Sequence, residues 1–171
     1  REKQCLIKKK LKSYLVRGKT MKAVIQRVSS AACSVEGNIT GEISEGLFIL
    51  LGVGEDDTEA DAEILAAKTA NLRIFCDEND KMNLSVLDIE GEILAVSQFT
   101  LCADTKKGNR PSFIKAMEPV RANELYEYYK KCLTEKGVKK IESGVFGADM
   151  LCSINNNGPV TIILDTVIWR K

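Results

Sequence analysis

A group of hydroxyl and amide side chains stands at the end of an apolar stretch in the middle of the chain. Ser97, Gln98 and Thr100 surround Phe99 directly after the apolar residues 93–96. Polar groups at the end of a strand are well placed to meet a ligand. The alternative is that the two hydroxyls only hydrogen-bond the backbone where the chain turns. Spacing alone favours the two interpretations equally.

The chain offers these hydroxyls no ordinary catalytic base. A Ser or Thr nucleophile needs a neighbouring group to take its proton, and the 171 residues include no histidine. Ser-His, Cys-His and His-ligated zinc mechanisms are therefore excluded. Lys106 and Lys107 are near in sequence, but a lysine must be desolvated before it can act as a base. Covalent catalysis is the less favoured use of Ser97 and Thr100.

Two further segments have a possible binding role beside an ordinary structural one. Proline fixes φ and lacks an N–H, so Gly158-Pro159 is expected to be a rigid backbone segment. Taken alone, the dipeptide is more typical of an ordinary turn. The segment 106–113 carries Lys106, Lys107 and Arg110 beside Phe113. Such a loop can hold phosphate and stack a base, although a solvated loop is the favoured interpretation in isolation.

The sequence pattern around these residues predicts an α/β fold in a single domain. We expect a mixed, partly closed, barrel-like β-sheet and two main helices. Many strands with two helices and no βαβ rhythm favour that architecture. Strands are expected at 22–28, 32–35, 39–43, 47–53, 92–99, 150–154 and 160–164. The run 47–53 is continuously apolar, which is typical of a strand buried on both faces.

Both helices are amphipathic. The first is expected to begin at an Asp56 or Asp57 N-cap and to end near Asn71. The second is expected at 121–136, before Gly137. The predicted buried faces hold Ile64, Leu65, Lys68 and Leu72 in the first helix, and Leu125, Tyr128, Tyr129, Cys132 and Leu133 in the second.

Charge is distributed unevenly along the chain. Residues 1–20 hold eight basic side chains and one acid, a net +7, which leaves −6 for the remainder of a chain of net +1. We interpret residues 1–20 as a basic N-terminal extension, disordered or non-native, with a targeting peptide and an RNA-attracting tail as alternatives. The folded domain is expected at 21–166 and a tail at 167–171.

The six cysteines are scattered, without a C-x-x-C pair. We therefore expect buried, reduced thiols and a cytoplasmic protein. No apolar run approaches the ~20 residues of a membrane helix, so no membrane partner is expected.

Taken together, the motifs resemble the D-aminoacyl-tRNA deacylase family. The resemblance spans residues 21–166 and rests on four segments and the opening of the domain, which occur in the family's order. They are Met21-Lys-Ala-Val-Ile-Gln-Arg-Val28, Ser97-Gln-Phe-Thr-Leu101, Arg110-Pro-Ser-Phe113, Phe146-Gly-Ala-Asp-Met150 and Asn156-Asn-Gly-Pro-Val-Thr161.

The resemblance implies hydrolysis of the ester of D-aminoacyl-tRNA, and of mischarged glycyl-tRNA, by a homodimer that binds the tRNA acceptor end. It implies no cofactor, no metal and no DNA partner. The implied catalytic groups are Ser97, Thr100 and the backbone N–H of Phe99. Gln98, Phe99, Met150, Gly158 and Pro159 would bind substrate, with Arg27, Phe113 and Asn156 in support.

The implied selection is by exclusion. The Gly158–Pro159 bond is expected to be cis, and its carbonyls, contributed by the other subunit, would occupy the space of an L side chain. Two alternatives remain open: a related deacylase with a trans Gly–Pro bond that accepts some L-aminoacyl-tRNAs, and a non-catalytic tRNA-binding module.

Overall fold

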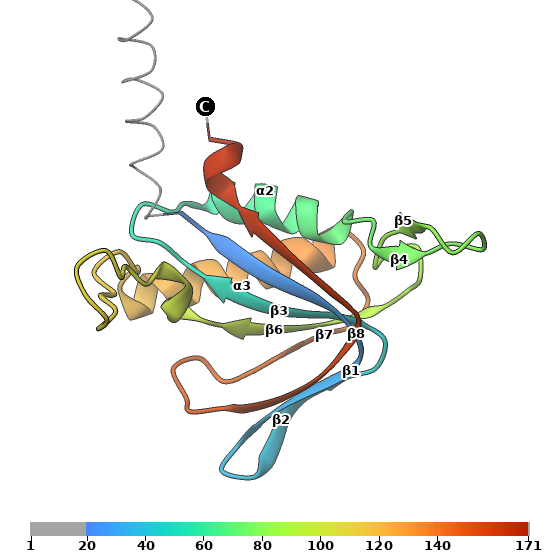
Figure 1. Ribbon diagram of the computed structural model, residues 1–171, viewed down its shortest axis with the longest axis horizontal. Coiled ribbons are helices and arrows are strands. Elements are labelled where there is room, and N and C mark those ends of the chain that lie inside the picture. Colours follow the sequence, from blue (N-terminus) through green and yellow to red (C-terminus); the bar gives the residue numbers. More distant parts are fainter. Residues whose placement is uncertain (1–19, 171) are drawn as a thin grey trace, which may run out of the picture.

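The computed structural model describes residues 20–170 and confirms the predicted α/β class with two main helices (Figure 1). Apart from Thr20, the predicted basic extension lies outside the described residues. In chain order the elements are β1 (Lys22–Val35), β2 (Asn38–Ile43), β3 (Gly46–Gly52), α2 (Glu59–Ala70), β4 (Phe75–Cys76), β5 (Met82–Leu84), β6 (Glu92–Ser97), η1 (Phe99–Cys102), α3 (Pro119–Glu135), β7 (Ile141–Ser143), β8 (Leu151–Asp165) and η2 (Thr166–Ile168).

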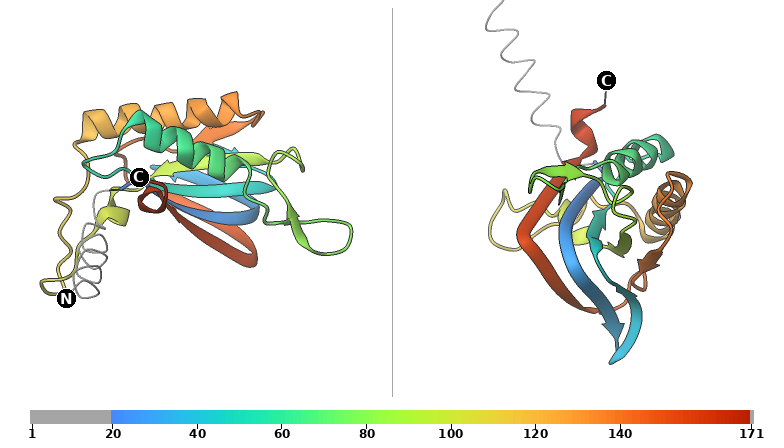
Figure 2. Two further views of the ribbon diagram at one scale, coloured as in Figure 1. Left: turned by 90° about the horizontal axis from the view of Figure 1, so that it is seen from above. Right: turned by 90° about the vertical axis from the view of Figure 1, so that its right-hand side faces the viewer.

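The main sheet is mixed and curls on itself. Its strand order is β2-β1-β3-β6-β7, with β8 paired to β1. β1 is antiparallel to β2, β3 and β8, whereas β3, β6 and β7 run parallel. The curl brings β2 against β7, because a Cβ on Gly41 would lie only 2.7 Å from the Ser143 carbonyl oxygen. The sheet is therefore nearly closed, as predicted (Figure 2).

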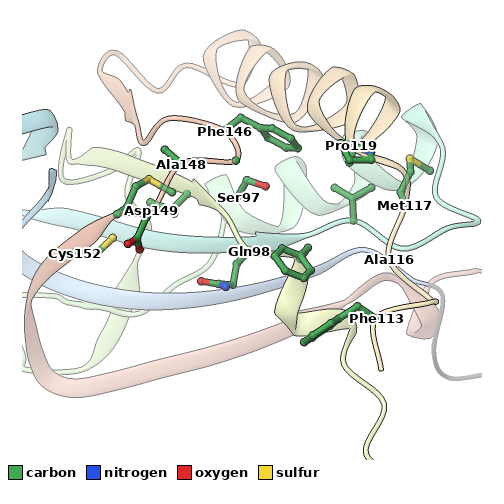
Figure 3. A pocket seen from close by; sticks show the side chains of 16 residues that line it. Ser97, Gln98, Phe113, Ala116, Met117, Pro119, Phe146, Ala148, Asp149 and Cys152 are labelled. Atoms are coloured by element: carbon green, nitrogen blue, oxygen red, sulfur yellow. The ribbon is translucent and has the colours of Figure 1, made fainter. Parts of the chain in front are cut away.

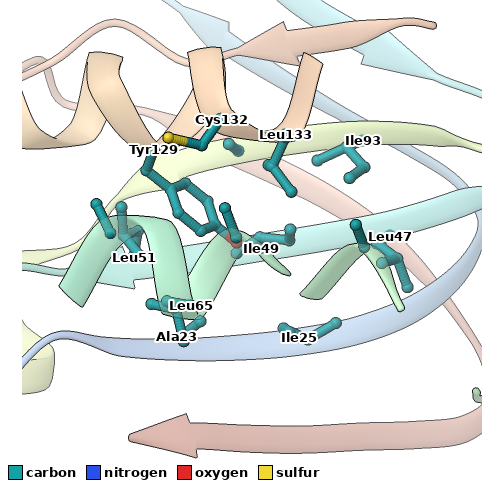
Figure 4. Close-up of a cluster of buried hydrophobic side chains, with 14 of the residues drawn as sticks. Ala23, Ile25, Leu47, Ile49, Leu51, Leu65, Ile93, Tyr129, Cys132 and Leu133 are labelled. Atoms are coloured by element: carbon teal, nitrogen blue, oxygen red, sulfur yellow. The ribbon is translucent and has the colours of Figure 1, made fainter. Parts of the chain in front are cut away.

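Two hydrophobic clusters lie on the two faces of the sheet. Leu47, Ile49 and Leu51 of β3 pack with α2 and α3 on the outer face (Figure 4). Phe48 points the other way, into a second cluster inside the curl that includes Leu94. The four side chains of β3 named here are all buried, so the prediction of a strand buried on both faces is confirmed.

The helices are where the pattern placed them, but the first N-cap prediction is wrong. Thr58 is the N-cap of α2, and its N–H donates to Asp61 at 2.9 Å in a capping box. The Asp57 carboxylate instead accepts the Met21 N–H at 2.7 Å and pairs with Arg170. Burial raises the pKa of this carboxyl to about 7.

The predicted helix faces need small corrections. Ile64 is 38% exposed and Lys68 is also exposed, and the small side chains of Ala62 and Ala66 pack against the core instead. In α3 the fully buried tyrosines are Tyr126 and Tyr129, while Tyr128 is only half-buried because its hydroxyl reaches Glu63.

Two pairs of expected strands are each a single strand. β1 runs without a break through residues 29–31, and β8 continues through the expected connection 155–159. The ladder between them holds a large irregularity: Gln26 pairs with Thr161, and Val28 pairs with Asn156. Four residues of β8, 157–160, thus face the single intervening residue of β1. We call this segment the 157–160 bulge.

No helix within residues 20–170 is long and apolar enough to cross a bilayer.

Candidate active site

A cavity of about 540 Å³ opens beyond the end of β6. It is walled by the end of β6 and η1, by the loop before α3, by the first turns of α3 and by the segment 146–152 (Figure 3). Of the residues that the sequence predicted for a site, Ser97, Gln98, Phe99, Phe113 and Met150 line this cavity. The structure therefore brings together three of the quoted motifs at one place.

Short-range contacts at the end of β3 fix the position of η1. The Gln98 N–H donates to the Leu51 carbonyl at 2.7 Å, which extends the parallel pairing of β3 and β6 by one residue. Gly52 allows η1 to lie against β3, because a Cβ there would be 2.8 Å from the Leu101 Cβ and 3.1 Å from the Gln98 carbonyl oxygen. The first residues of η1 thereby face the cavity.

The first turn of η1 presents backbone donors. The N–H groups at the start of a helix have no acceptor inside it, and in η1 these belong to Phe99 and Thr100. Both residues are exposed. Phe99 lines the cavity, and Thr100 follows it outside the lining.

The hydroxyls have no histidine and no desolvated lysine beside them, although the Asp149 carboxylate lines the same cavity as Ser97. The Thr100 Oγ1 accepts a hydrogen bond of 2.5 Å from the Gln98 amide. Lys106 and Lys107 are exposed and do not line the cavity. Neither lysine is desolvated in the way that proton abstraction from Ser97 or Thr100 requires.

Aromatic rings form the outer wall. Phe99 is 56% exposed and meets Phe113 edge to face, with ring centroids 5.0 Å apart and an interplanar angle of 73°. The loop that carries Phe113 is closed by paired backbone hydrogen bonds between Asp104 and Ser112, and by the ion pair of Lys115 with Asp104 at 2.6 Å. A planar ligand can thus lie against a ring that the fold holds in place.

Sequence reasoning missed several wall residues. Phe146, Met117, Asp149 and Cys152 also line the cavity. In a sequence, the apolar side chains of a pocket cannot be distinguished from those of a core. Only the motif 146–150 could have indicated two of these residues, Phe146 and Asp149.

The 157–160 bulge is built as a rigid projection. Arg27 donates to the Asn157 carbonyl at 3.2 Å and is itself held by the Ile74 carbonyl at 2.7 Å. The Asn156 amide spans the base of the bulge, donating to the carbonyls of Arg27 at 2.9 Å and Val160 at 3.0 Å. The main chain of the bulge is thus fixed from both sides.

Within the bulge, the Gly158–Pro159 peptide bond is cis and Gly158 has φ +123°. Both residues are exposed, and neither lines the cavity of its own chain. Arg27, Asn156 and Thr100 also lie outside the cavity lining. The predicted site residues therefore fall into two separate groups, one at the cavity and one at the bulge.

The chain thus combines a curled α/β sheet that carries two helices on its outer face, a cavity beyond β6 and a braced Gly-Pro bulge. A family model described as D-Tyr-tRNA(Tyr) deacylase matches residues 24–165. The chain belongs to this family.

Curated relatives agree with this assignment. The D-aminoacyl-tRNA deacylase of Koribacter versatilis is 58% identical over 146 residues, covering 85% of this chain and 97% of the relative. The D-aminoacyl-tRNA deacylase of Bacillus pumilus is 56% identical over 146 residues, with 85% and 99% covered.

Solved structures share the fold. The structure described as c-Myc DNA Unwinding Element Binding Protein has a TM-score of 0.79 and 42% identity, covering 84% of this chain and 97% of that one. A second structure, at 17% identity, has a TM-score of 0.74 and covers 85% and 99%.

Proposed function

We propose that this protein hydrolyses the ester bond of D-aminoacyl-tRNA, and of mischarged glycyl-tRNA, and so releases free tRNA and the amino acid. Family membership supports the proposal, and so does the composition of the cavity. The observation that carries it is a pocket that opens at the start of η1, where backbone N–H groups have no acceptor inside the helix, with no histidine and no desolvated lysine beside its hydroxyls. We propose the cytoplasm as its location, as the scattered cysteines predicted.

Such a pocket suits an ester that is already activated. An aminoacyl ester needs correct placement of its carbonyl and a water more than it needs a strong nucleophile. The N–H groups of Phe99 and Thr100 stabilise the negative charge that develops on the ester oxygen. The free 2′-hydroxyl of the terminal ribose helps to activate the water. Ser97 lies at the end of β6, where it hydrogen-bonds the reacting groups.

The aromatic wall suits the terminal adenosine of tRNA. Base stacking on an aromatic face contributes about 1–3 kcal/mol. The edge-to-face contact with Phe113 holds the Phe99 ring in a fixed orientation for such stacking. Gln98 supplies an amide for the base or ribose. Met150 closes the opposite side of the cavity, next to Gly144, where a Cβ would lie 2.5 Å from the Met150 sulfur.

The bulge acts on a second copy of the chain. Gly158 and Pro159 lie outside their own cavity, so their carbonyl oxygens can serve a site only in another molecule. β8 offers a surface for such a homodimer, because Leu151 and Ile163 on it are 74% and 70% exposed. In the dimer the two carbonyls accept hydrogen bonds from the substrate ammonium and fill the space of an L side chain. A D side chain points outward, and glycine has none to exclude.

The deciding experiment is incubation of the purified full chain with D-Tyr-tRNA and L-Tyr-tRNA, followed by measurement of free amino acid. The proposal predicts rapid release of D-tyrosine and little release of L-tyrosine. Cleavage of both esters would support the alternative deacylase that accepts L-aminoacyl-tRNA. Binding of tRNA without cleavage of either ester would support the non-catalytic module.

The substitution Thr100→Ala is expected to leave most of the activity. The backbone N–H survives, and only the hydrogen bond from the Gln98 amide is lost, which is worth about 1 kcal/mol or about fivefold in rate. Loss of a true nucleophile costs about 10⁴-fold or more. Single-turnover deacylation of D-Tyr-tRNA measures the difference, and Thr100→Ser is the control that keeps the hydroxyl. A folded Thr100→Ala protein without activity would restore the nucleophile hypothesis.

The affinity for tRNA is expected to depend only mildly on salt. The described domain is acidic, and Lys106, Lys107 and Arg110 are the exposed cations nearest in sequence to the aromatic wall. About three phosphate contacts give a slope no steeper than about −3 in a plot of log affinity against log salt.

The double substitution Lys107→Ala/Arg110→Ala is expected to reduce that slope by about 2. Lys81→Ala, in the exposed turn between β4 and β5, is the control and should leave it unchanged. Fluorescence anisotropy with labelled tRNA at several salt concentrations checks both values, and a slope much steeper than −3 would show a larger RNA footprint.

A further inference from the structure

Two cysteines face each other inside the curled sheet. Cys33 of β1 and Cys152 of β8 are direct partners in the antiparallel ladder, and their sulfur atoms lie 2.7 Å apart. Cys33 is fully buried in the inner hydrophobic cluster. Cys152 is half-buried and lines the cavity beyond β6 (Figure 3). One thiol of the pair is thus accessible from the cavity, and the other is not.

The backbone at this position suits a covalent bond between the two sulfurs. Residues directly opposite in an antiparallel ladder have Cα atoms about 4.5–5.5 Å apart, and a disulfide requires about 4.4–6.8 Å. The two ranges overlap, so the ladder register is compatible with such a bond. Among the described cysteines, Cys76, Cys102 and Cys132 make no comparable sulfur–sulfur contact.

We propose that Cys33 and Cys152 are a modification site, a dithiol that a peroxide converts into a reversible intramolecular disulfide. The reaction begins at Cys152, which the cavity exposes. Its thiolate attacks a peroxide oxygen, the O–O bond breaks, and the sulfur becomes a sulfenic acid while the other oxygen leaves as water or an alcohol. The Cys33 sulfur then attacks the sulfenic sulfur. The S–S bond forms, and the hydroxyl group leaves with the Cys33 proton as a second water.

The surroundings of the two thiols set this order. Burial in the inner cluster, together with the neighbouring sulfur, raises the pKa of Cys33 to about 12. Cys33 therefore stays a thiol at neutral pH and is a poor first nucleophile, since the thiolate is the reactive form. Its position opposite Cys152 makes it the resolving partner.

The bond would tie the two longest strands together beside the cavity wall. Residues 33 and 152 are far apart in sequence, and a cross-link that closes a long loop stabilises a protein mainly by restricting the unfolded chain. The oxidised protein is therefore expected to unfold at a higher denaturant concentration than the reduced protein.

The test uses the reduced full-length protein, treated with hydrogen peroxide and then denatured in an alkylating reagent. We expect the loss of two alkylatable thiols and of two hydrogen atoms in the intact mass, reversed by dithiothreitol. Peptide mapping of the same wild-type sample is expected to show the Cys33 peptide joined to the Cys152 peptide. Full alkylation after peroxide treatment, or a map that joins other cysteines, would overturn the proposal.

Single substitutions separate the two roles. Cys33→Ser is expected to stop at a sulfenic acid on Cys152, which dimedone traps, whereas Cys152→Ser is expected to form no disulfide. Cys76→Ser removes an exposed cysteine and is the matched control, in which the disulfide should still form. None of these readouts depends on ester hydrolysis, so the proposal can fail or hold independently of the proposed function.

Discussion

Gly158→Ala is expected to reduce hydrolysis of D-aminoacyl-tRNA by about 100-fold, the typical cost of misplacing a positioning group by about 1 Å. Gly158 has φ +123°, where a residue with a Cβ is strained. The new Cβ would also lie 2.8 Å from the Val160 Cγ2 and 3.0 Å from an Arg27 guanidinium nitrogen. The bulge must shift to accommodate it, and in the proposed mechanism this moves its two carbonyls away from the substrate ammonium.

Gly37→Ala is the matched control for this prediction. Gly37 also has a positive φ, +81°, but open space surrounds it and it lies in the β1–β2 turn. It reports the cost of backbone strain alone. The measurement is the rate at which each variant deacylates D-Tyr-tRNA and L-Tyr-tRNA. The assay temperature is chosen so that the two variants are folded to the same extent. If folded Gly158→Ala protein kept the wild-type rate and the wild-type ratio of D to L hydrolysis, the exclusion mechanism would be wrong.

The substitution Gly52→Ala is expected to lower kcat/KM by a similar factor, although Gly52 lies outside the cavity lining. Its Cβ would be 2.8 Å from the Leu101 Cβ and 3.1 Å from the Gln98 carbonyl oxygen. Both atoms belong to the backbone or its first side-chain carbon, so η1 must move as a unit. The N–H groups of Phe99 and Thr100 would move with it, which in the proposed mechanism weakens stabilisation of the ester oxygen in the transition state.

The control for Gly52 is a glycine just before the start of β6, where an added Cβ would meet only side-chain atoms. A Cβ on Gly91 would lie 2.9 Å from the Ile89 Cδ1 and 3.0 Å from the Val86 Cγ2, far from the cavity residues in the fold. Gly91→Ala should lower the midpoint of thermal unfolding without a specific loss of kcat/KM. Equal kcat/KM values for Gly52→Ala and Gly91→Ala would show that the position of η1 does not depend on its contact with Gly52 of β3.

Local pattern was sufficient for much of the fold. The continuously apolar run at β3 predicted a strand with two buried faces, because an ordinary half-exposed strand alternates. The helices followed from their periodicity. The N-cap of α2 was misplaced, since Asp57 is a good capping residue whose carboxylate is used instead to bind the Met21 N–H. The long-range hydrogen bond of the Asp57 carboxylate therefore decided where α2 begins.

The continuity of β1 and β8 was beyond local pattern. Asn155 to Pro159 carries every signal of a turn, yet both of its flanks pair with the same long strand, so the ladder resumes after the bulge. The site residues also divide into those that local pattern could predict and those that it could not. Ser97, Gln98 and Phe99 could be found from polarity at a strand end, whereas Met117 and Cys152 have no signal that distinguishes a pocket from a core.

The placement of the bulge outside its own cavity has a consequence for genetics. A chain with a damaged bulge still carries an intact cavity, and a chain with a damaged cavity still carries an intact bulge. Coexpression of two such inactive alleles should therefore restore up to one working centre per mixed pair, whereas either allele alone restores none. Complementation of this kind is expected if, as proposed, the cavity of one molecule and the bulge of another form each working centre.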